Sequence, residues 1–524
     1  MIAANGAGRG RHRPKTWEDG LRVDLGIGGH YPVRVWPRPH ESSQDTEFID
    51  ENSLIEANMV SLGPAVRDGA AKCGRCFKVT MTCALAASVV LGSRPALAAG
   101  LIRDSETESL IRDYAKPIFD VAGLGSHGVK IHLINNRAFN AFVVDGQNMF
   151  FHVGTLMKSN TPNQVIGVIA HETGHITGGH LSRLRQAVAG ARSASLMLQI
   201  IGLAAMALGA ASGSGSAGQI GMGTLYGGQS AAMRTILAYR RAEESSADQA
   251  ALNFLNGSKQ SARGMLQTFQ FFASQGMTSL NNVDPYLQSH PMPQQRIVQL
   301  QQLARSSPYF ERRDPPELQL RHDLMRAKLM GFLDNPRTVY NKYPTSDQSL
   351  PARYARAIAT YKRSGVRPFL PKIDALITAH PKNPYFLEVK GQFLFESGKA
   401  RQAIPPLRKA VGLAPREGLI RIMLAQAMLA GGAKADIDPA IKHLRQALVR
   451  ENTSALGYRQ LASAYAKKRK ISQAELASAQ AYFYEGNLKL AKVQAKRAKS
   501  KFRPGTPNWI KADDILSFQP PKKR

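Results

Sequence analysis

Cysteine is scarce in this chain, and all three cysteines lie near the N-terminus. They are Cys73, Cys76 and Cys83 in a chain of 524 residues. The whole sequence after Cys83 is therefore free of cysteine, which excludes a disulfide framework there. The spacing of Cys73 and Cys76 can form half of a metal or redox site, but only if this segment belongs to a folded domain.

Acidic residues are also few, since 38 Asp and Glu stand against 69 Lys and Arg and give a formal net charge of +31. Residues 1–98 carry about as many acids as bases, so the excess lies downstream. No basic cluster is interleaved with aromatic residues, and no nucleic-acid-binding motif is present. We therefore expect no nucleic-acid partner. The dispersed lysines indicate solvated helix faces, and a peripheral contact with an anionic membrane surface remains open.

The sequence has no set of long apolar runs, which excludes a protein with several membrane spans. The segment Leu196–Ala211 is nearly all apolar, but at about 16 residues it is short for a bilayer. It predicts a buried or interfacial helix, followed by Gly- and Ser-rich sequence to Gly228. A lid over a binding site and a plain core helix with a mobile connection are both open interpretations.

Residues 71–98 have the pattern of an export signal. Lys72, Arg75 and Lys78 precede the apolar run Val79–Leu91, and Ala96-Leu97-Ala98 supplies a cleavage site. We expect a mature chain from about Ala99 in the periplasm of a Gram-negative bacterium. Residues 1–70 show no periodicity, so they are either disordered or precede the true translation start, near Met81 or just before it. A membrane anchor with a cytoplasmic tail is the alternative, although Val79–Leu91 is short for a span.

The next region alternates between helical and strand patterns. Leu101–Lys116 is amphipathic, residues 129–134 alternate as a strand, and Ala141–Val144 with Met149–Val153 flank a turn signal at Asp145-Gly146. Helices are predicted for 164–185 and 235–256. We expect an α+β domain at residues 99–313.

Beyond Pro315 the sequence becomes rich in alanine and repeats with a period of 34 residues. Small residues and proline fall at the positions expected for tetratricopeptide repeats, in one unit at Gly391, Gly398, Ala403, Ala410 and Pro415 and in another at Ala479, Tyr482, Gly486, Ala491 and Ala498. We expect an all-α solenoid at residues 317–502 and a basic tail at 503–524. An irregular alanine-rich helical bundle is the alternative.

The sequence His171-Glu172-Thr173-Gly174-His175 is an HExxH motif inside a predicted helix. Histidines at i and i+4 share one helix face, so both can bind one zinc ion, and Glu172 lies beside them as a candidate general base. The motif alone can also occur by chance in a helix that uses its histidines for packing.

A catalytic zinc site needs a third protein ligand. The metzincin pattern places a histidine at position 181, which is Leu181, and His180 is one residue early. One residue rotates a helical side chain by about 100°, so that pattern fails. The segment Tyr239–Asp248 offers Glu244 as a ligand instead, with Asp248 one turn later to orient a ligand histidine.

HExxH followed about 70 residues later by ExxAD resembles the gluzincin metalloproteases of the CAAX prenyl protease and HtpX type. The Asn140-Ala141-Phe142 segment is similar to the edge-strand region of that family, and Ser289-His290-Pro291 with Arg296 is similar to its later His-Pro and Arg elements. The exported members with C-terminal tetratricopeptide repeats are most similar. The resemblance implies a zincin-like fold, one Zn²⁺ per chain, and the ligands His171, His175 and Glu244.

The resemblance also implies roles outside the ligand set. Glu172 acts as general base and Asp248 supports the site, while His290 is a candidate fourth ligand that restrains activity. A helix-start histidine is the equally open alternative for His290. Arg296 is a candidate for support of the transition state, and an extended substrate would pair with an edge strand near Phe142–Val153.

We therefore predict a zinc metalloendopeptidase that degrades misfolded or stalled outer-membrane proteins and contacts their assembly machinery through its repeats. Chaperone-like help in assembly is compatible with this interpretation. The main alternative is a catalytically silent chaperone or scaffold that acts through the repeats, although an intact Glu172 argues against it.

Overall fold

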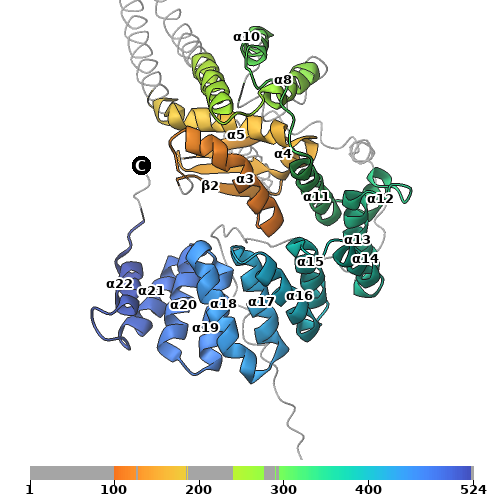
Figure 1. Cartoon of the computed structure of the whole chain (residues 1–524). Coiled ribbons are helices and arrows are strands. Elements are labelled where there is room, and N and C mark those ends of the chain that lie inside the picture. The colour runs from red at the N-terminus through yellow and green to blue at the C-terminus, as the bar shows by residue number, and fades with distance from the viewer. Residues whose placement is uncertain are drawn as a thin grey trace, which may run out of the picture.

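The computed structural model describes residues 100–125, 128–144, 146–184, 186, 240–276, 290 and 294–520 (Figure 1). The expected export segment with its cysteines, and the apolar run Leu196–Ala211, lie outside these residues. The described residues form a small sheet covered by helices, followed by an arc of paired helices. This arrangement confirms the expected fold class, an α+β protease region followed by an all-α repeat solenoid.

The sheet has four strands in the order β1-β2-β4-β3. They are β1 (Leu101–Ile102), β2 (Lys130–Ile134), β3 (Ala141–Val144) and β4 (Asn148–His152). β3 and β4 form the predicted antiparallel hairpin, with Phe142 opposite Phe150, whereas β2 and β4 are parallel. β4 therefore lies inside the sheet. Of the two hairpin strands, only β3 lies at an edge of the sheet among the described strands.

Helices α3 (Ser105–Val121), α4 (Val153–Lys158), α5 (Pro162–Thr177), α8 (Arg263–Gly276) and α10 (Gln294–Arg305) accompany this sheet, and residues 240–257 form another helix. α5 begins with a capping box, in which the Thr161 hydroxyl accepts from the Gln164 backbone N–H and the Gln164 side chain accepts from that of Thr161. Its apolar side, including Val165, Val168 and Ile169, is buried.

The long helix predicted for residues 164–185 is interrupted. α5 ends at Thr177, Gly178 and Gly179 form a turn, and a helical segment resumes at His180. Gly179 has φ +64°, a conformation that side-chain-bearing residues rarely adopt. The apolar pattern continues beyond the turn to Leu184, which is why periodicity alone predicted a single helix.

The second part consists of antiparallel helix pairs (Figure 1). They are α11 (Pro316–Leu333), α12 (Pro336–Lys342), α13 (Leu350–Ser364), α14 (Val366–Ala379), α15 (Pro384–Glu396), α16 (Ala400–Leu413), α17 (Gly418–Gly431), α18 (Ile437–Arg450), α19 (Ala455–Lys467), α20 (Ile471–Tyr484), α21 (Leu488–Lys499) and α22 (Pro507–Ser517). α22 packs on α20 and α21, within the stretch 503–524 that we expected to be a tail.

The small residues of the repeat pattern lie where helices approach one another. A Cβ at Gly391 of α15 would be 2.4 Å from Cγ of Leu407 in α16. Ala403 and Ala410 of α16 are fully buried. Gly398 and Gly486 have φ of +74° and +79° in the turns between helices. Each position therefore needs a small residue, either for close packing or for the turn conformation.

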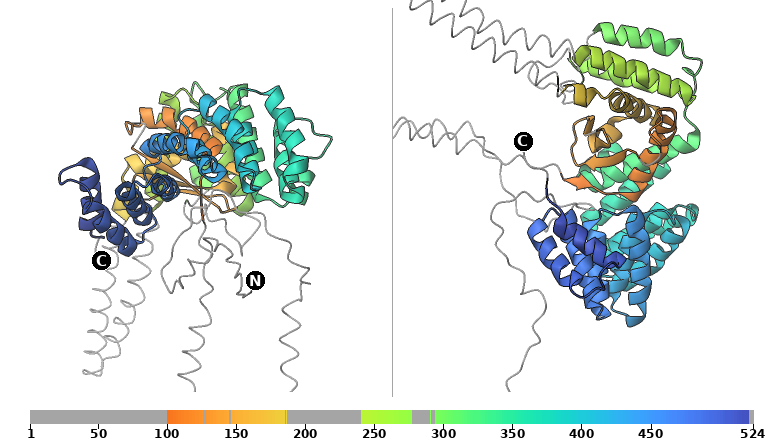
Figure 2. Two further views of the ribbon diagram at one scale, coloured as in Figure 1. Left: turned by 90° about the horizontal axis from the view of Figure 1, so that it is seen from below. Right: turned by 90° about the vertical axis from the view of Figure 1, so that its left-hand side faces the viewer.

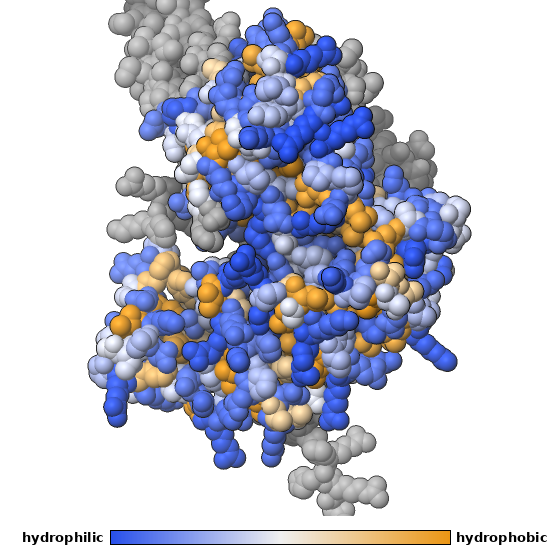
Figure 3. All heavy atoms as spheres, viewed as in Figure 1, coloured by the Kyte–Doolittle hydropathy of each residue, from blue (hydrophilic) through white to orange (hydrophobic). Residues whose placement is uncertain are grey.

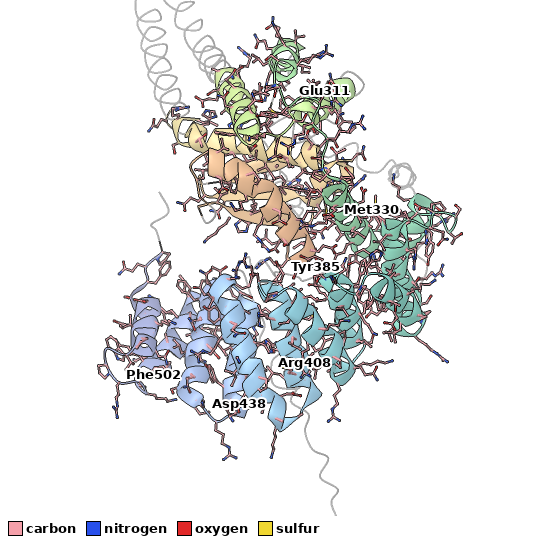
Figure 4. All side chains as sticks on the ribbon, viewed as in Figure 1. Glu311, Met330, Tyr385, Arg408, Asp438 and Phe502 are labelled. Atoms are coloured by element: carbon pink, nitrogen blue, oxygen red, sulfur yellow. The ribbon has the colours of Figure 1, made fainter. Side chains whose placement is uncertain are left out.

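The two parts meet around a buried lysine. The ammonium of Lys328 on α11 lies 2.6 Å from Asp104, 3.1 Å from Glu388 and 3.5 Å from Glu106. Tyr385, at the start of α15, lies on the side of the solenoid that faces the sheet domain (Figure 4). The domain thus sits over one rim of the arc, as the views in Figure 1 and Figure 2 agree.

No helix within the described ranges is long and apolar enough to cross a bilayer. The face drawn in Figure 3 is mostly hydrophilic, with small scattered apolar areas.

Candidate metal centre

His171, Glu172 and His175 all lie on α5. His171 and Glu172 are almost completely buried, and His175 is partly buried. The two histidines are one turn apart, which brings their Nε2 atoms to 3.1 Å from each other. The sequence spacing thus produces two imidazoles that converge on one point.

The third predicted ligand comes from the helix of residues 240–257. This helix packs closely on α5, because a Cβ at Gly174 would be 2.7 Å from the carbonyl oxygen of Ala247. The close contact brings Glu244 to the histidines, with Oε2 at 3.3 Å from His171 Nε2 and Oε1 at 3.5 Å from His175 Nε2. Glycine inside the HExxH motif is therefore a packing requirement of the site.

A third histidine completes the group. His290 is buried, and its Nδ1 is 3.3 Å from His171 Nε2 and 3.0 Å from Glu244 Oε1. Its other ring nitrogen, Nε2, is 3.4 Å from Oε1 of Glu172. His290 therefore lies between the metal-ligating atoms and the candidate general base. We refer to His171, His175, Glu244 and His290 as the ligand cluster.

The ligand cluster has the dimensions of a tetrahedral metal site. Metal bonds of about 2.0–2.1 Å in a tetrahedron separate neighbouring ligand atoms by about 3.3 Å. The five separations given above run from 3.0 to 3.5 Å, with both oxygens of Glu244 taking part. One ligand atom from each residue lies within 4.8 Å of the others. Nitrogen and carboxylate oxygen are also donors that suit zinc. The residues therefore fit a single divalent cation.

Asp248 and Arg296 lie behind His171. Asp248 Oδ1 is 3.0 Å from His171 Nδ1, the nitrogen that points away from the ligand cluster. The buried Arg296 guanidinium donates to both Asp248 oxygens and lies 2.9 Å from Glu244 Oε2. Carboxylates in this position hold the ring and tautomer of a ligand histidine. These contacts show Arg296 bound to the supporting carboxylates.

His175 has a different partner, which sequence reasoning did not find. Its Nδ1 is 2.9 Å from Nδ1 of His180, and His180 Nε2 is 2.8 Å from Glu243 Oε2. The spacing in the sequence excludes His180 as a zinc ligand and predicts no other role for it. The signal that could have revealed it is the Gly178-Gly179 pair, which allows the chain to turn back toward His175.

Burial and charge set the ionisation of the site. Burial raises the pKa of the Glu172 carboxyl above its ordinary value. Burial also lowers the pKa of His171, but hydrogen bonds to Asp248 and Glu244 outweigh this effect and raise it to about 9. Oε1 of Glu172 has no hydrogen-bond partner within the described part of the chain. The carboxylates thus favour positive charge on His171, whereas burial and the charge of His171 lower the pKa of His175 well below its ordinary value. Glu172 faces the ligand cluster with a free acceptor.

Two histidines one turn apart, a glutamate from a later helix and a buried glutamate beside them define a gluzincin-type metallopeptidase. Residues 102–304 match the model of peptidase family M48. The match covers the sheet, the helices around it and every residue of the ligand cluster. The chain is therefore a metallopeptidase with an attached helical-repeat region.

Several curated relatives extend the similarity into the repeats. The Beta-barrel assembly-enhancing protease of Escherichia coli (strain K12) is 25% identical over 387 residues, which are 71% of this chain and 75% of the relative. The protein of the same name from Yersinia pestis is 24% identical, over 68% and 72% of the two chains. The solved structure named MamA MSR-1 C2 covers 32% of this chain and 93% of its own length, with 19% identity and a TM-score of 0.28.

Proposed function

We propose that this protein is a zinc-dependent endopeptidase of the periplasm that degrades misfolded or stalled outer-membrane proteins. The tetrahedral spacing of the ligand cluster, with the Glu172 carboxyl beside it, is the observation that carries the catalytic part. Zinc is the metal we propose because two imidazoles with one carboxylate form one of its catalytic ligand sets. One ion is expected per chain.

His171, His175 and Glu244 are the proposed protein ligands, and Asp248 orients His171. When bound, zinc supplies a Lewis acid that polarises the scissile carbonyl and makes water more acidic. Glu172 accepts the proton of the attacking water and then donates it to the leaving amine. A raised pKa suits this second step, because a buried carboxyl keeps its proton until the amine takes it. Arg296 keeps Asp248 and Glu244 in place.

His290 is the proposed restraint on this activity. A catalytic site keeps one coordination position for water, and the fourth corner of the ligand cluster is filled by His290 Nδ1. The same ring separates Glu172 from the other ligands. We propose that the enzyme is latent while His290 holds this position and becomes active when His290 moves away.

The proposed substrates are unfolded chains. β3 offers a strand edge, and α5, which carries the site, packs against it. Pairing with an edge strand recognises backbone, so it suits clients with little regular structure. Outer-membrane proteins are proposed from the export signal at 71–98 and from the names of the relatives, and the solenoid is proposed to dock to their assembly machinery. A peripheral contact with an anionic membrane surface is proposed from the excess of Lys and Arg over Asp and Glu.

The test compares cleavage of an unfolded protein by the wild type and by Glu172→Gln, both purified after export, with bound zinc quantified. Loss of cleavage with zinc retained supports the metallopeptidase and Glu172 as its base. If neither protein cleaves although zinc is bound, the His290→Ala variant decides. Its activity would reveal latency, and its silence would favour a chaperone or scaffold that acts through the repeats.

A further inference from the structure

We infer that His180 and Glu243 form a relay that positions the ligand His175, so that Glu243 holds the second zinc histidine through an intervening imidazole. His180 is then a positioning residue and does not bind the metal. This inference rests on the proposed zinc site.

The hydrogen-bond directions along the relay follow from the geometry. His175 directs Nε2 toward the ligand cluster, so in the neutral ring its proton is on Nδ1. That N–H can donate only if His180 Nδ1, 2.9 Å away, is an acceptor. His180 must then carry its proton on Nε2, which lies 2.8 Å from Glu243 Oε2 in a charge pair that lacks the angle of a hydrogen bond. Every proton on the two rings is thereby assigned.

The local fold is built to bring His180 into this place. α5 ends at Thr177, and Gly179 reverses the chain with a positive φ. A Cβ at Gly178 would be 2.1 Å from Nε2 of His180, so only glycine leaves room for the ring. His180 is 4% exposed even though it follows a turn. A histidine buried over two glycines, between a metal ligand and a carboxylate, indicates a specific role.

With the relay, one helix positions both ligand histidines. The helix of residues 240–257 supplies Glu244 to the ligand cluster, Asp248 to His171 directly, and Glu243 to His175 through His180. Arg183 lies 3.0 Å from Glu243 and forms an ion pair with it. Partners of this kind fix the orientation and tautomer of ligand histidines, and their loss typically lowers metal affinity about 10- to 100-fold.

The test measures zinc affinity by competition with a chelator, and the visible spectrum of the cobalt-substituted protein, in full-length variants. His180→Phe removes both nitrogens while it keeps a ring. His180→Asn keeps an acceptor near the position of Nδ1. Glu243→Gln keeps an acceptor for His180 but removes the charge. Thr177→Val is the control, since its hydroxyl donates to the backbone carbonyls of Thr173 and Gly174 in the same helix.

We expect His180→Phe to bind zinc about 10- to 100-fold more weakly and to change the cobalt spectrum. His180→Asn should recover most of the affinity, and Glu243→Gln should fall between the two. Wild-type affinity and an unchanged spectrum in both His180→Phe and Glu243→Gln would overturn the relay. Equal losses in Thr177→Val would overturn it as well, by showing a general effect of the turn.

The failure of the relay is separable from that of the proposed function. A wild-type protein that binds no divalent metal would overturn both. Zinc binding by the wild type without proteolysis, also in His290→Ala, would overturn only the proposed proteolytic function. The relay would stand, because zinc affinity and the cobalt spectrum are measured without any cleavage assay.

Discussion

The guanidinium of Arg296 donates to both oxygens of the Asp248 carboxylate, with Nε 2.5 Å from Oδ2 and Nη2 2.8 Å from Oδ1. Both side chains are buried, and the guanidinium also lies 2.9 Å from Glu244. Two carboxylates that serve the ligand cluster thus depend on one cation. Paired geometry of this kind fixes the orientation of the carboxylates as well as their charge.

Replacing Arg296 should therefore damage the site through stability and metal binding. In Arg296→Met, two buried carboxylates lose their counter-charge, which typically costs about 3–5 kcal/mol. We expect a loss of this order in urea unfolding with a chelator present, together with weaker zinc binding. Arg305→Met, an exposed position on the same helix, is the control and should change little. A folded, fully stable Arg296→Met that binds zinc but turns over slowly would instead assign Arg296 to the transition state.

Glu244→Gln should lower bound zinc while the fold is retained. The amide keeps the size of the side chain but removes the anionic ligand, and zinc prefers carboxylate to amide oxygen in this role. We expect at least about a tenfold loss of zinc affinity, measured on protein whose circular dichroism matches the wild type. Unchanged zinc content would remove Glu244 from the ligand set.

His290→Ala should raise proteolysis. If His290 occupies the fourth position most of the time, its removal frees that position for water and exposes Glu172. A tenfold rise would correspond to about 1.4 kcal/mol of preference for the closed arrangement. The rate of cleavage of an unfolded protein is the measurement, and His443→Ala in the solenoid is the control. An inert His290→Ala with normal zinc would return His290 to a structural role.

The residues of the ligand cluster could be named from the sequence, whereas the partner of His175 could not. Spacing placed His171, Glu172 and His175 together because one helix turn fixes their separation. Glu244 was found through its motif. The contact of His180 with His175 was missed because the rotation per residue was applied to an unbroken helix. The apolar pattern continues past Gly179 and gives no sign that the helix is interrupted there.

The contact between the protease region and the solenoid could not be predicted from sequence patterns. Lys328 gave no sequence signal, because a single lysine in a helix usually indicates a solvated face. Its partners Asp104 and Glu388 lie more than two hundred residues before it and sixty after it in the chain. α22 was missed for a related reason, since its stretch is short and rich in Lys and Pro.

The carboxylates around Lys328 predict that the stability of the protein depends on pH. Burial raises the pKa of Glu106 from 4.5 to about 7, although Lys328 acts in the opposite direction. A raised folded-state pKa gives stability that is complete below the unfolded value and is lost as the pH rises through the folded value. The unfolding free energy should therefore fall between about pH 4.5 and 7, by about 3 kcal/mol from this group.

Glu106→Gln isolates that contribution. The variant keeps an acceptor for the Tyr354 hydroxyl, which donates to Glu106 Oε2, and has no proton to lose. We expect it to be more stable than the wild type at pH 8 and similar to it at pH 4.5, as measured by urea unfolding. The exposed Glu317→Gln on α11 is the control. A constant difference between Glu106→Gln and wild type at both pH values would contradict the assignment.

Helix packing in the solenoid can be tested with two glycines. Alanine at Gly391 would place Cβ 2.4 Å from Leu407 Cγ, so α15 and α16 must separate or Leu407 must leave its rotamer. Overpacking of this kind typically costs about 1–3 kcal/mol. Gly412 lies in the helix that Gly391 faces, and a Cβ there would meet nothing within 4 Å. Gly412→Ala should thus be neutral or stabilise slightly, since alanine favours a helix over glycine by about 1 kcal/mol. Thermal unfolding of the two variants measures the contrast, and equal midpoints would show that the pattern does not depend on this close approach.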